Sequence, residues 1–341
     1  MTEHITSETN RPLNQLFDKA VLARSDAIAV IAEERRISFF ELQLYVEWMA
    51  GYFQSINLQP GQRVALLMPN SPEVVISFWG LMRAGGVAVP LDVFDDEQNL
   101  RTSLLRSHAD AVITTPQYKQ VLDKILSAFG RKGISPCLTI AVFEEDNITT
   151  LKKNTRVAEN GRMAAIVPPS ENGGETRQAE DCFHQGGSQA TAGYPAVVQL
   201  QYAHEFFVYT HEELEREAEA LIARTQLGEN DRVVCCAPLC QEPYLSHCLI
   251  AAMAAGAAVV LAESDKWENF LQTLTGEQVT VFAGPVGLLR RLTASDAAPS
   301  LRWYFCLDAV SPELDGGLGE KPNFHIGQFN DTINTGVSFQ L

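Results

Sequence analysis

The sequence predicts an α/β protein built on parallel sheets with helices on both faces. Short apolar segments alternate with amphipathic segments at helical spacing through most of the chain. Gly and Pro residues separate these segments, as expected at turns and helix ends. The 341 residues, of which 46% are hydrophobic, suffice for one large or two ordinary domains with a sizeable core.

The first third of the chain alternates helices and strands. Ser38 and Glu41 form a capping-box pattern, which predicts a helix that continues to about Ile56. Gly85 and Gly86 are placed to end another helix. We expect helices at residues 13–23, 39–56, 73–84 and 95–108, and strands at residues 27–31, 64–68, 87–91 and 111–114.

The middle of the chain has a different character. Residues 152–181 are rich in charged, amide, Gly and Pro residues and show little periodicity, which favours a linker or surface excursion. We therefore predict a first α/β subdomain at residues 12–150, a linker at 151–181 and a second α/β subdomain at 182–341.

The second half resumes the alternation. We expect helices at residues 205–224, 245–255, 267–274 and 286–292, and strands at residues 232–237, 257–261, 279–283 and 303–307. Thr210, followed by His211 and two glutamates, is typical of a helix N-cap.

The charge balance excludes some classes of partner. With 26 basic and 42 acidic residues the formal net charge is −16, which argues against binding to nucleic acid or anionic lipid. No apolar segment is long enough for a membrane span, and the polar N-terminus does not resemble a secretory signal. The seven scattered cysteines predict reduced, mostly buried thiols and a cytoplasmic protein.

Five phrases of the sequence occur in the order found in a known family. They are residues 37–42 (ISFFEL), 82–92 (MRAGGVAVPLD), 227–233 (LGENDRV), 254–261 (AAGAAVVL) and 279–285 (VTVFAGP). They resemble the N-terminal portion of the adenylate-forming superfamily, which includes acyl-CoA synthetases, peptide-synthetase adenylation domains and luciferases. The resemblance implies the two sheet-bearing subdomains. Because the chain ends at Leu341, we expect it to lack the family's β-rich subdomain and C-terminal domain.

The family's phosphate loop corresponds to residues 188–196 (SQATAGYPA) when aligned on Gly193 and Pro195. The resemblance implies weak nucleotide binding through Ser188, Thr191 and Gly193. Ala196 stands at the lysine position, so the positive charge of the loop is absent. A Gly/Ser-rich turn without a ligand is the alternative interpretation.

Two further positions of the nucleotide site follow from the resemblance. Phe329 would stack on adenine and Thr332 would contact the α-phosphate. Ile333 replaces the glutamate that assists magnesium, so we expect ATP or AMP as the candidate cofactors and no Mg²⁺. We identify no catalytic residue and no metal ligand.

The acid pocket of the family follows the phrase Pro238-Leu239. Gln241 and Tyr244 are the candidate pocket residues here, and Gln241 could hydrogen-bond a carboxylate. For Cys240, inert packing is favoured over a reactive thiol because no histidine is adjacent.

Three functions remain open. The leading one is a ligase-like, acid-activating homologue with weak or absent activity, a pseudoenzyme that binds an acyl or aryl acid, a nucleotide or a carrier protein. The second is an active AMP-forming acid–thiol ligase or acyl-adenylate synthetase completed by a second polypeptide, and the third is a non-catalytic interaction scaffold. We also expect a homo-oligomer or a partner polypeptide bound through the C-terminal half, where several phenylalanines concentrate. These are Phe305, Phe324, Phe329 and Phe339.

Overall fold

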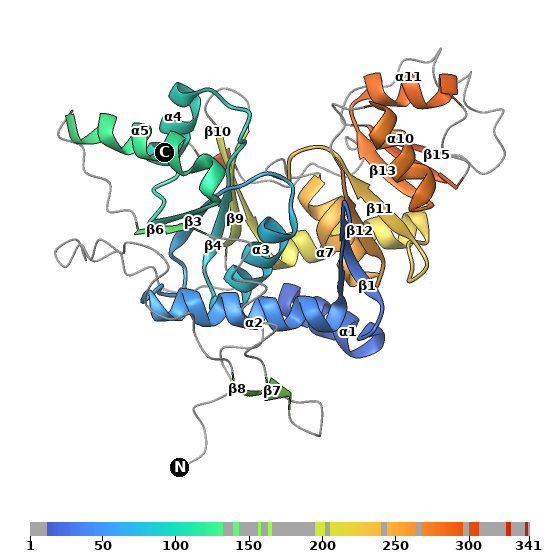
Figure 1. Ribbon diagram of the computed structural model, residues 1–341, viewed down its shortest axis with the longest axis horizontal. Coiled ribbons are helices and arrows are strands. Elements are labelled where there is room, and N and C mark those ends of the chain that lie inside the picture. Colours follow the sequence, from blue (N-terminus) through green and yellow to red (C-terminus); the bar gives the residue numbers. More distant parts are fainter. Residues whose placement is uncertain are drawn as a thin grey trace. The chain divides into compact units, whose positions relative to one another are not determined.

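The computed structural model confirms the predicted fold class (Figure 1). It describes residues 12–131, 139–142, 156–157, 163–165, 195–201, 205–239, 244–262, 267–295, 300–306, 325–328 and 338–339. Two compact units each contain one seven-stranded sheet, which we call sheet A and sheet B. In these described ranges no helix is both long and apolar enough to cross a bilayer.

Both units are assembled from separate parts of the sequence. The first comprises Met1–Leu42, Asn70–Pro72 and His211–Val337, and the second comprises Gln43–Pro69, Glu73–Thr210 and Ser338–Leu341. This division differs from the predicted one, because the first strands of the chain pair with strands of the C-terminal half. The boundaries at residues 12–150, 151–181 and 182–341 stay a prediction.

Sheet A has the strand order β15-β14-β13-β11-β12-β1-β2. Its strands are β1 (Ile28–Ala32), β2 (Arg35–Ser38), β11 (Arg232–Cys235), β12 (Ala258–Leu261), β13 (Val281–Gly284), β14 (Trp303–Cys306) and β15 (His325–Gln328). β2 is antiparallel to β1, and every other neighbouring pair in this sheet is parallel. The sheet therefore has a common carboxyl edge, where most of its strands end.

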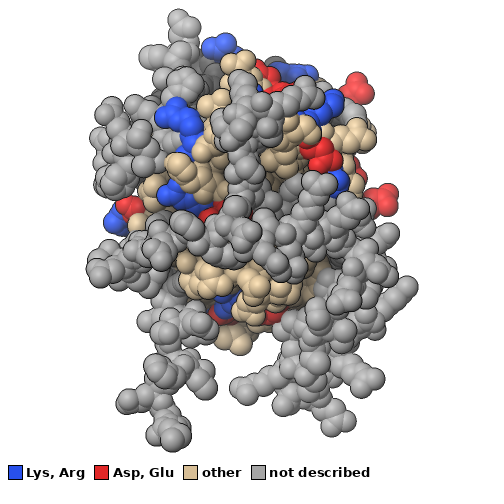
Figure 2. All heavy atoms as spheres, turned by 90° about the vertical axis from the view of Figure 1, so that its left-hand side faces the viewer, with Lys and Arg blue, Asp and Glu red and all other residues tan. Residues whose placement is uncertain are grey.

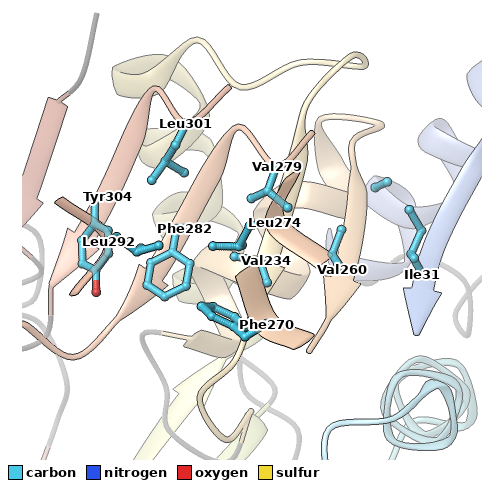
Figure 3. Close-up of a cluster of buried hydrophobic side chains, with 11 residues drawn as sticks. Ile31, Val234, Val260, Phe270, Leu274, Val279, Phe282, Leu292, Leu301 and Tyr304 are labelled. Carbon is cyan, nitrogen blue, oxygen red and sulfur yellow. The ribbon is translucent and has the colours of Figure 1, made fainter. Parts of the chain in front are cut away.

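One face of sheet A is covered by α10 (Trp267–Gly276) and α11 (Val286–Ser295). Because side chains alternate along a strand, every second residue of adjacent strands contributes to the same apolar layer. Figure 3 shows Val234, Val260, Phe282 and Tyr304 in this layer, together with Phe270 from α10. The other labelled members are Ile31, Leu274, Val279, Leu292 and Leu301.

The alternate residues of the strands serve the opposite side of sheet A. There α1 (Pro12–Arg24), α7 (His211–Thr225), a π-helix named η2 (Leu245–Ile250) and α9 (Ala251–Ala254) pack against one another. Cys235 of β11 and Phe305 of β14 contact residues of η2. Sheet A is thus buried on both faces, as parallel sheets normally are.

Sheet B has the strand order β16-β10-β9-β4-β3-β5-β6. Its strands are β3 (Arg63–Leu67), β4 (Val87–Pro90), β5 (Ala111–Thr114), β6 (Thr139–Val142), β9 (Pro195–Gln201), β10 (Glu205–Thr210) and β16 (Ser338–Phe339). The helices of this part of the chain are α2 (Phe39–Ser55), α3 (Pro72–Ala84), α4 (Glu97–Arg106) and α5 (Pro116–Arg131). The small pair β7 (Arg156–Val157) and β8 (Met163–Ala165) is antiparallel and separate from both large sheets.

Local sequence signals are realised in the structure. The Ser38 hydroxyl accepts from the Glu41 amide at 3.1 Å, and the Glu41 carboxylate accepts from the Ser38 amide at 3.1 Å, so the capping box is complete. Gly85 has φ +85°, and the Gly86 amide donates to the Leu81 carbonyl at 3.0 Å, which ends α3 as predicted.

The predicted helix at residues 205–224 was wrong in its first part. Residues 205–210 form β10, which pairs with β9 and β16, and α7 begins only at His211. The aromatic and β-branched residues Phe206 to Tyr209 favour a strand, while the helical spacing begins after Thr210. The predicted start of a helix after Thr210 is therefore confirmed, and the predicted start at residue 205 is not.

Candidate functional site

The topology of sheet A locates a candidate binding edge. From β11 the chain crosses to β12 on one side, and it then returns past β11 to reach β13 on the other side. Where the winding direction reverses in this way, the carboxyl ends of the two strands leave a crevice in which open α/β sheets bind ligands. In this chain that point lies between the ends of β11 and β13.

The segment after β11 is held by a side chain from a distant part of the sequence. The Asn70 carboxamide donates to the Ala237 carbonyl at 2.6 Å and accepts from the Leu239 amide at 3.0 Å. The same amide nitrogen lies 3.6 Å from the Cys235 sulfur. Asn70 therefore fixes the backbone direction of the chain as it leaves the carboxyl edge.

Buried thiols occupy the end of β11. Cys235, Cys236 and Cys248 are free cysteines, and Cys235 and Cys248 are fully buried. A hydrogen bond with Cys248, reinforced by burial, raises the pKa of the Cys235 thiol well above its ordinary value. Burial raises the pKa of Cys236 as well. These described thiols are neutral packing groups, as the sequence predicted.

The end of β13 approaches its neighbours closely. A Cβ atom at Gly284 would lie 2.6 Å from a ring carbon of Phe282 and 3.5 Å from the Cys236 sulfur. The residue that follows, Pro285, accepts a hydrogen bond of 2.7 Å from the Tyr304 hydroxyl. A glycine is required here because any side chain would push against the aromatic ring.

The helix that follows the β11 segment starts with a π-helical turn. Tyr244 precedes it with its side chain 1% exposed. Ser246 and His247 are buried next to one another, with the Ser246 hydroxyl 2.7 Å from His247 Nδ1. The His247 ring meets the Phe305 ring edge-on at 6.0 Å between centroids. π-helical turns often occur at functional sites, and η2 contacts both β11 and β13.

The opposite edge of sheet A carries a network of charged groups. Asp231, Thr280 and Arg302 each directly precede a strand, and these strands are adjacent in the sheet. Arg302 contacts Asp231 through two nitrogens at 3.0 and 2.5 Å, and the Thr280 hydroxyl donates to Asp231 at 2.7 Å. Arg302 also donates to the Thr225 carbonyl at the end of α7.

The ionised form of Asp231 is favoured by this network. Burial alone would raise the pKa of its carboxyl group, but hydrogen bonds from Arg302, Thr280 and the Gly228 amide outweigh burial and hold the pKa below its usual value. Asp231 belongs to one of the phrases that resemble the superfamily, and in this structure its contacts are structural.

A second group of ion pairs lies on the same edge, which we call the amino edge because the parallel strands of sheet A begin there. Glu277 at the end of α10 accepts from Arg36 at 3.1 Å and from Arg232 at 2.8 Å. It thereby connects β2, β11 and α10. The amino edge is therefore stabilised by paired charges.

Most of the predicted site residues cannot be placed. Ser188, Thr191, Gly193, Gln241, Phe329 and Thr332 lie outside the described residues, so their roles stay predictions. Tyr244 is described and is buried at the start of η2.

The sequence analysis missed Asn70 and Gly284 and misjudged Phe305. Asn70 stands between Pro69 and Pro72, directly before α3. Phe305 is 2% exposed, stacks on Trp303 at 5.7 Å and contacts His247, so it does not contribute to an exposed docking surface.

The described surface carries both signs of charge. On the face shown in Figure 2, basic and acidic side chains are interspersed among uncharged residues.

A comparison with protein families decides the affiliation of the chain. A family model described as AMP-binding enzyme matches residues 17–320. The chain belongs to the AMP-binding enzyme family. Among curated relatives, N-(5-amino-5-carboxypentanoyl)-L-cysteinyl-D-valine synthase of Penicillium rubens is 21% identical over 297 residues, which are 86% of this chain and 7% of that synthase. A long-chain-fatty-acid–CoA ligase of Haemophilus influenzae is 33% identical over 112 residues, 33% of this chain and 20% of that ligase.

Solved structures of this kind share the fold. The N-terminal domain of FACL13 from Mycobacterium tuberculosis matches with a TM-score of 0.71 and 18% identity, over 94% of this chain and 75% of that domain. NpsA-ThdA from Klebsiella oxytoca, an artificially fused adenylation–PCP di-domain, matches with a TM-score of 0.67 and 18% identity, over 94% of this chain and 53% of the fusion. The chain has the fold of an AMP-binding, acid-activating N-terminal domain, and it spans a small fraction of the curated relatives above.

Proposed function

We propose that this AMP-binding family member is a cytoplasmic, ligase-like protein that binds a carboxylic acid and a nucleotide but forms little or no acyl-adenylate by itself. The family match over residues 17–320 carries this proposal. The reversal of winding between β11 and β13 supports it, because it provides the crevice in which such a ligand would bind.

The weak activity follows from two substitutions in the aligned motifs. Ala196 removes the positive charge of the phosphate loop, and Ile333 removes the carboxylate that would assist magnesium. Acid activation develops negative charge on a phosphoryl centre, and its catalysis depends on such charged groups. If each group supplies about 3 kcal/mol of transition-state stabilisation, the two losses together cost on the order of 10⁴-fold in rate.

An exchange experiment tests the proposal. ATP–pyrophosphate exchange is measured with a panel of fatty and aromatic acids, for the natural sequence and for the double variant Ala196→Lys with Ile333→Glu. We expect exchange near background for the natural sequence and a clear acid-dependent gain for the double variant. The single variants serve as controls, because each restores one group.

Each other result selects one of the alternatives. Robust acid-dependent exchange by the natural sequence would favour an active AMP-forming ligase, and a further gain with an added polypeptide would identify a completing partner. Absence of exchange, of acid binding and of nucleotide binding would favour a non-catalytic interaction scaffold.

The retained nucleotide groups lead to a second expectation. Ser188, Thr191 and Thr332 keep hydroxyls for a phosphate, whereas the positive charge of the loop is lost. Repulsion by the acidic chain grows with ligand charge, so AMP or adenosine should bind at least as well as ATP, with little dependence on magnesium. Calorimetry with the three ligands, with and without magnesium, checks this; tight magnesium-dependent ATP binding contradicts it.

A carrier protein is the partner that we propose to test first. The fusion from Klebsiella oxytoca joins an adenylation module to a carrier module. Co-purification with carrier domains from the organism that makes this protein tests for a carrier partner. Light scattering then tests for self-association and so distinguishes a carrier partner from a homo-oligomer.

A further inference from the structure

Asn70 joins two segments that are far apart in the sequence. Its carboxamide makes one donated and one accepted hydrogen bond with the backbone of Ala237 and Leu239, which lie 167 and 169 residues further along the chain. Both bonds are directed at the segment by which β11 leaves the carboxyl edge, next to the reversal of winding between β11 and β13.

The bonding pattern requires a carboxamide. The Ala237 carbonyl needs a donor and the Leu239 amide needs an acceptor, and an asparagine presents both from one planar group. An ionised aspartate supplies the acceptor but places a second oxygen against the carbonyl. An alanine supplies neither group.

We propose that Asn70 is a positioning residue, which holds Ala237 to Leu239 in the conformation that receives the carboxylic acid at the carboxyl edge of sheet A. This inference rests on the proposed function for the acid, whereas the held conformation stands on the hydrogen bonds alone. Asn70 acts through the backbone of the segment and not through contact with a reacting atom.

The variant Asn70→Asp can be switched by pH. At pH 8 the carboxylate cannot donate to the Ala237 carbonyl, and the segment loses one bond and gains a repulsion. At pH 5 a fraction of the aspartate is protonated, because burial beside a carbonyl raises its pKa above the usual value of about 3.9. The protonated acid can donate and accept, as the asparagine does.

Among the described residues, the titratable side chain bonded to Asn70 is Cys235, whose thiol also donates to the Ala237 carbonyl at 3.3 Å. The Cys235 thiol faces Asn70 and is hydrogen-bonded to Cys248. Because the pKa of Cys235 is raised, this thiol stays neutral between pH 5 and pH 8.

The experiment measures amide hydrogen exchange of peptides that cover residues 236–244 in the full chain. We expect exchange about ten-fold faster in Asn70→Asp than in the natural sequence at pH 8, and a ratio near two-fold at pH 5, with other peptides of the sheet unchanged. Comparing the ratio at each pH removes the intrinsic effect of pH on exchange. Ser71→Ala is the matched control, since in the part of the chain that the structure describes its buried hydroxyl has no hydrogen-bond partner.

Calorimetric titration with benzoate and octanoate at pH 8 gives the second measurement. We expect about ten-fold weaker acid binding by Asn70→Asp, with AMP binding unchanged. Equal acid binding by both proteins would overturn the proposal, as would exchange that is unchanged or that increases evenly over the whole unit. If the natural sequence binds neither acid and local exchange still responds as expected, the proposed function fails while the positioning of the segment by Asn70 holds.

Discussion

The two edges of sheet A are built from the same strands but from different chemistry. The amino edge is formed by paired charges, with Asp231 bound by Arg302 and Glu277 bound by Arg36 and Arg232. At the carboxyl edge, the described groups next to β11 and β13 are a carboxamide, thiols and glycine.

We infer from this difference that the amino edge serves the stability of the fold, whereas the carboxyl edge is the one suited to ligand binding. At the amino edge the described groups Asp231, Arg302 and Glu277 are already paired with neighbouring elements, so they offer little to a ligand. At the carboxyl edge, neutral groups shape the backbone and leave charge to be supplied by other segments. A motif residue such as Asp231 can therefore serve the stability of the fold, through its contacts with Arg302 and Thr280.

The largest expected effect is at the amino edge. Asp231→Asn leaves Arg302 partly buried beside a neutral group, and we expect the free energy of unfolding to fall by about 3 kcal/mol. Denaturant unfolding at pH 7 measures this. Glu229→Gln is the control, because its ion pair with Arg24 is more exposed and should contribute less than about 1 kcal/mol. Equal losses in the two variants would remove the special role of the Asp231 network.

At the carboxyl edge, Gly284→Ala is expected to cause a smaller loss in the free energy of unfolding. The added methyl group meets the Phe282 ring, and overpacking of this kind costs about 1–3 kcal/mol. Gly228→Ala is the matched control, since nothing lies within 4 Å of a Cβ there and its stability should change little. If both variants unfold at the same denaturant concentration, the close approach at Gly284 is not a constraint.

The smallest expected effects concern the pH dependence of the free energy of unfolding, which should differ between the two edges. The pKa of Asp231 is lowered in the folded state, so its contribution is present above about pH 4 and is lost as pH falls further. The pKa values of Cys235 and Cys236 are raised, so their contribution is complete below about pH 8.5 and is lost progressively above it.

Two variants identify the group responsible for each part of the pH profile of stability. The acid limb is the loss of stability at low pH, and the alkaline limb is the loss at high pH. Asp231→Asn should flatten the acid limb alone, and Cys236→Ala should flatten the alkaline limb alone. Thermal unfolding from pH 3 to pH 10 provides the measurement. An alkaline limb that persists unchanged in Cys236→Ala would exclude that thiol as a source.

Local rules made much of the fold predictable. The capping box at Ser38 and the glycine at position 85 act within a few residues, so the sequence contains everything they need. The order of strands was less accessible, because β1 pairs with β12 more than 200 residues away. For β10, the charged helix that follows obscured a strand of aromatic residues.

The candidate site was predictable only in part. The ordered phrases indicated the fold, and Tyr244, chosen from its place after Pro238-Leu239, stays a predicted pocket residue. Asn70 could not be found, because its backbone partners have no side-chain signature and lie in another part of the chain. Gly284 was part of a recognised phrase, but its need for glycine depends on the direction of the Phe282 ring.

The π-helical turn η2 has a consequence for how this protein can change. The Ala251 amide bonds to the Ser246 carbonyl five residues earlier, so the turn holds one residue more than an α-helix would. Deleting one residue from this turn can restore ordinary α-helical bonding without shortening the chain elsewhere. Tyr244 and the residues before it would then keep nearly the same direction relative to α9, because five π-helical residues complete about the same rotation as four α-helical residues. A single codon loss in this stretch would thus alter the side chains of the turn and leave the flanking residues in register, which a codon loss inside an ordinary α-helix would not do.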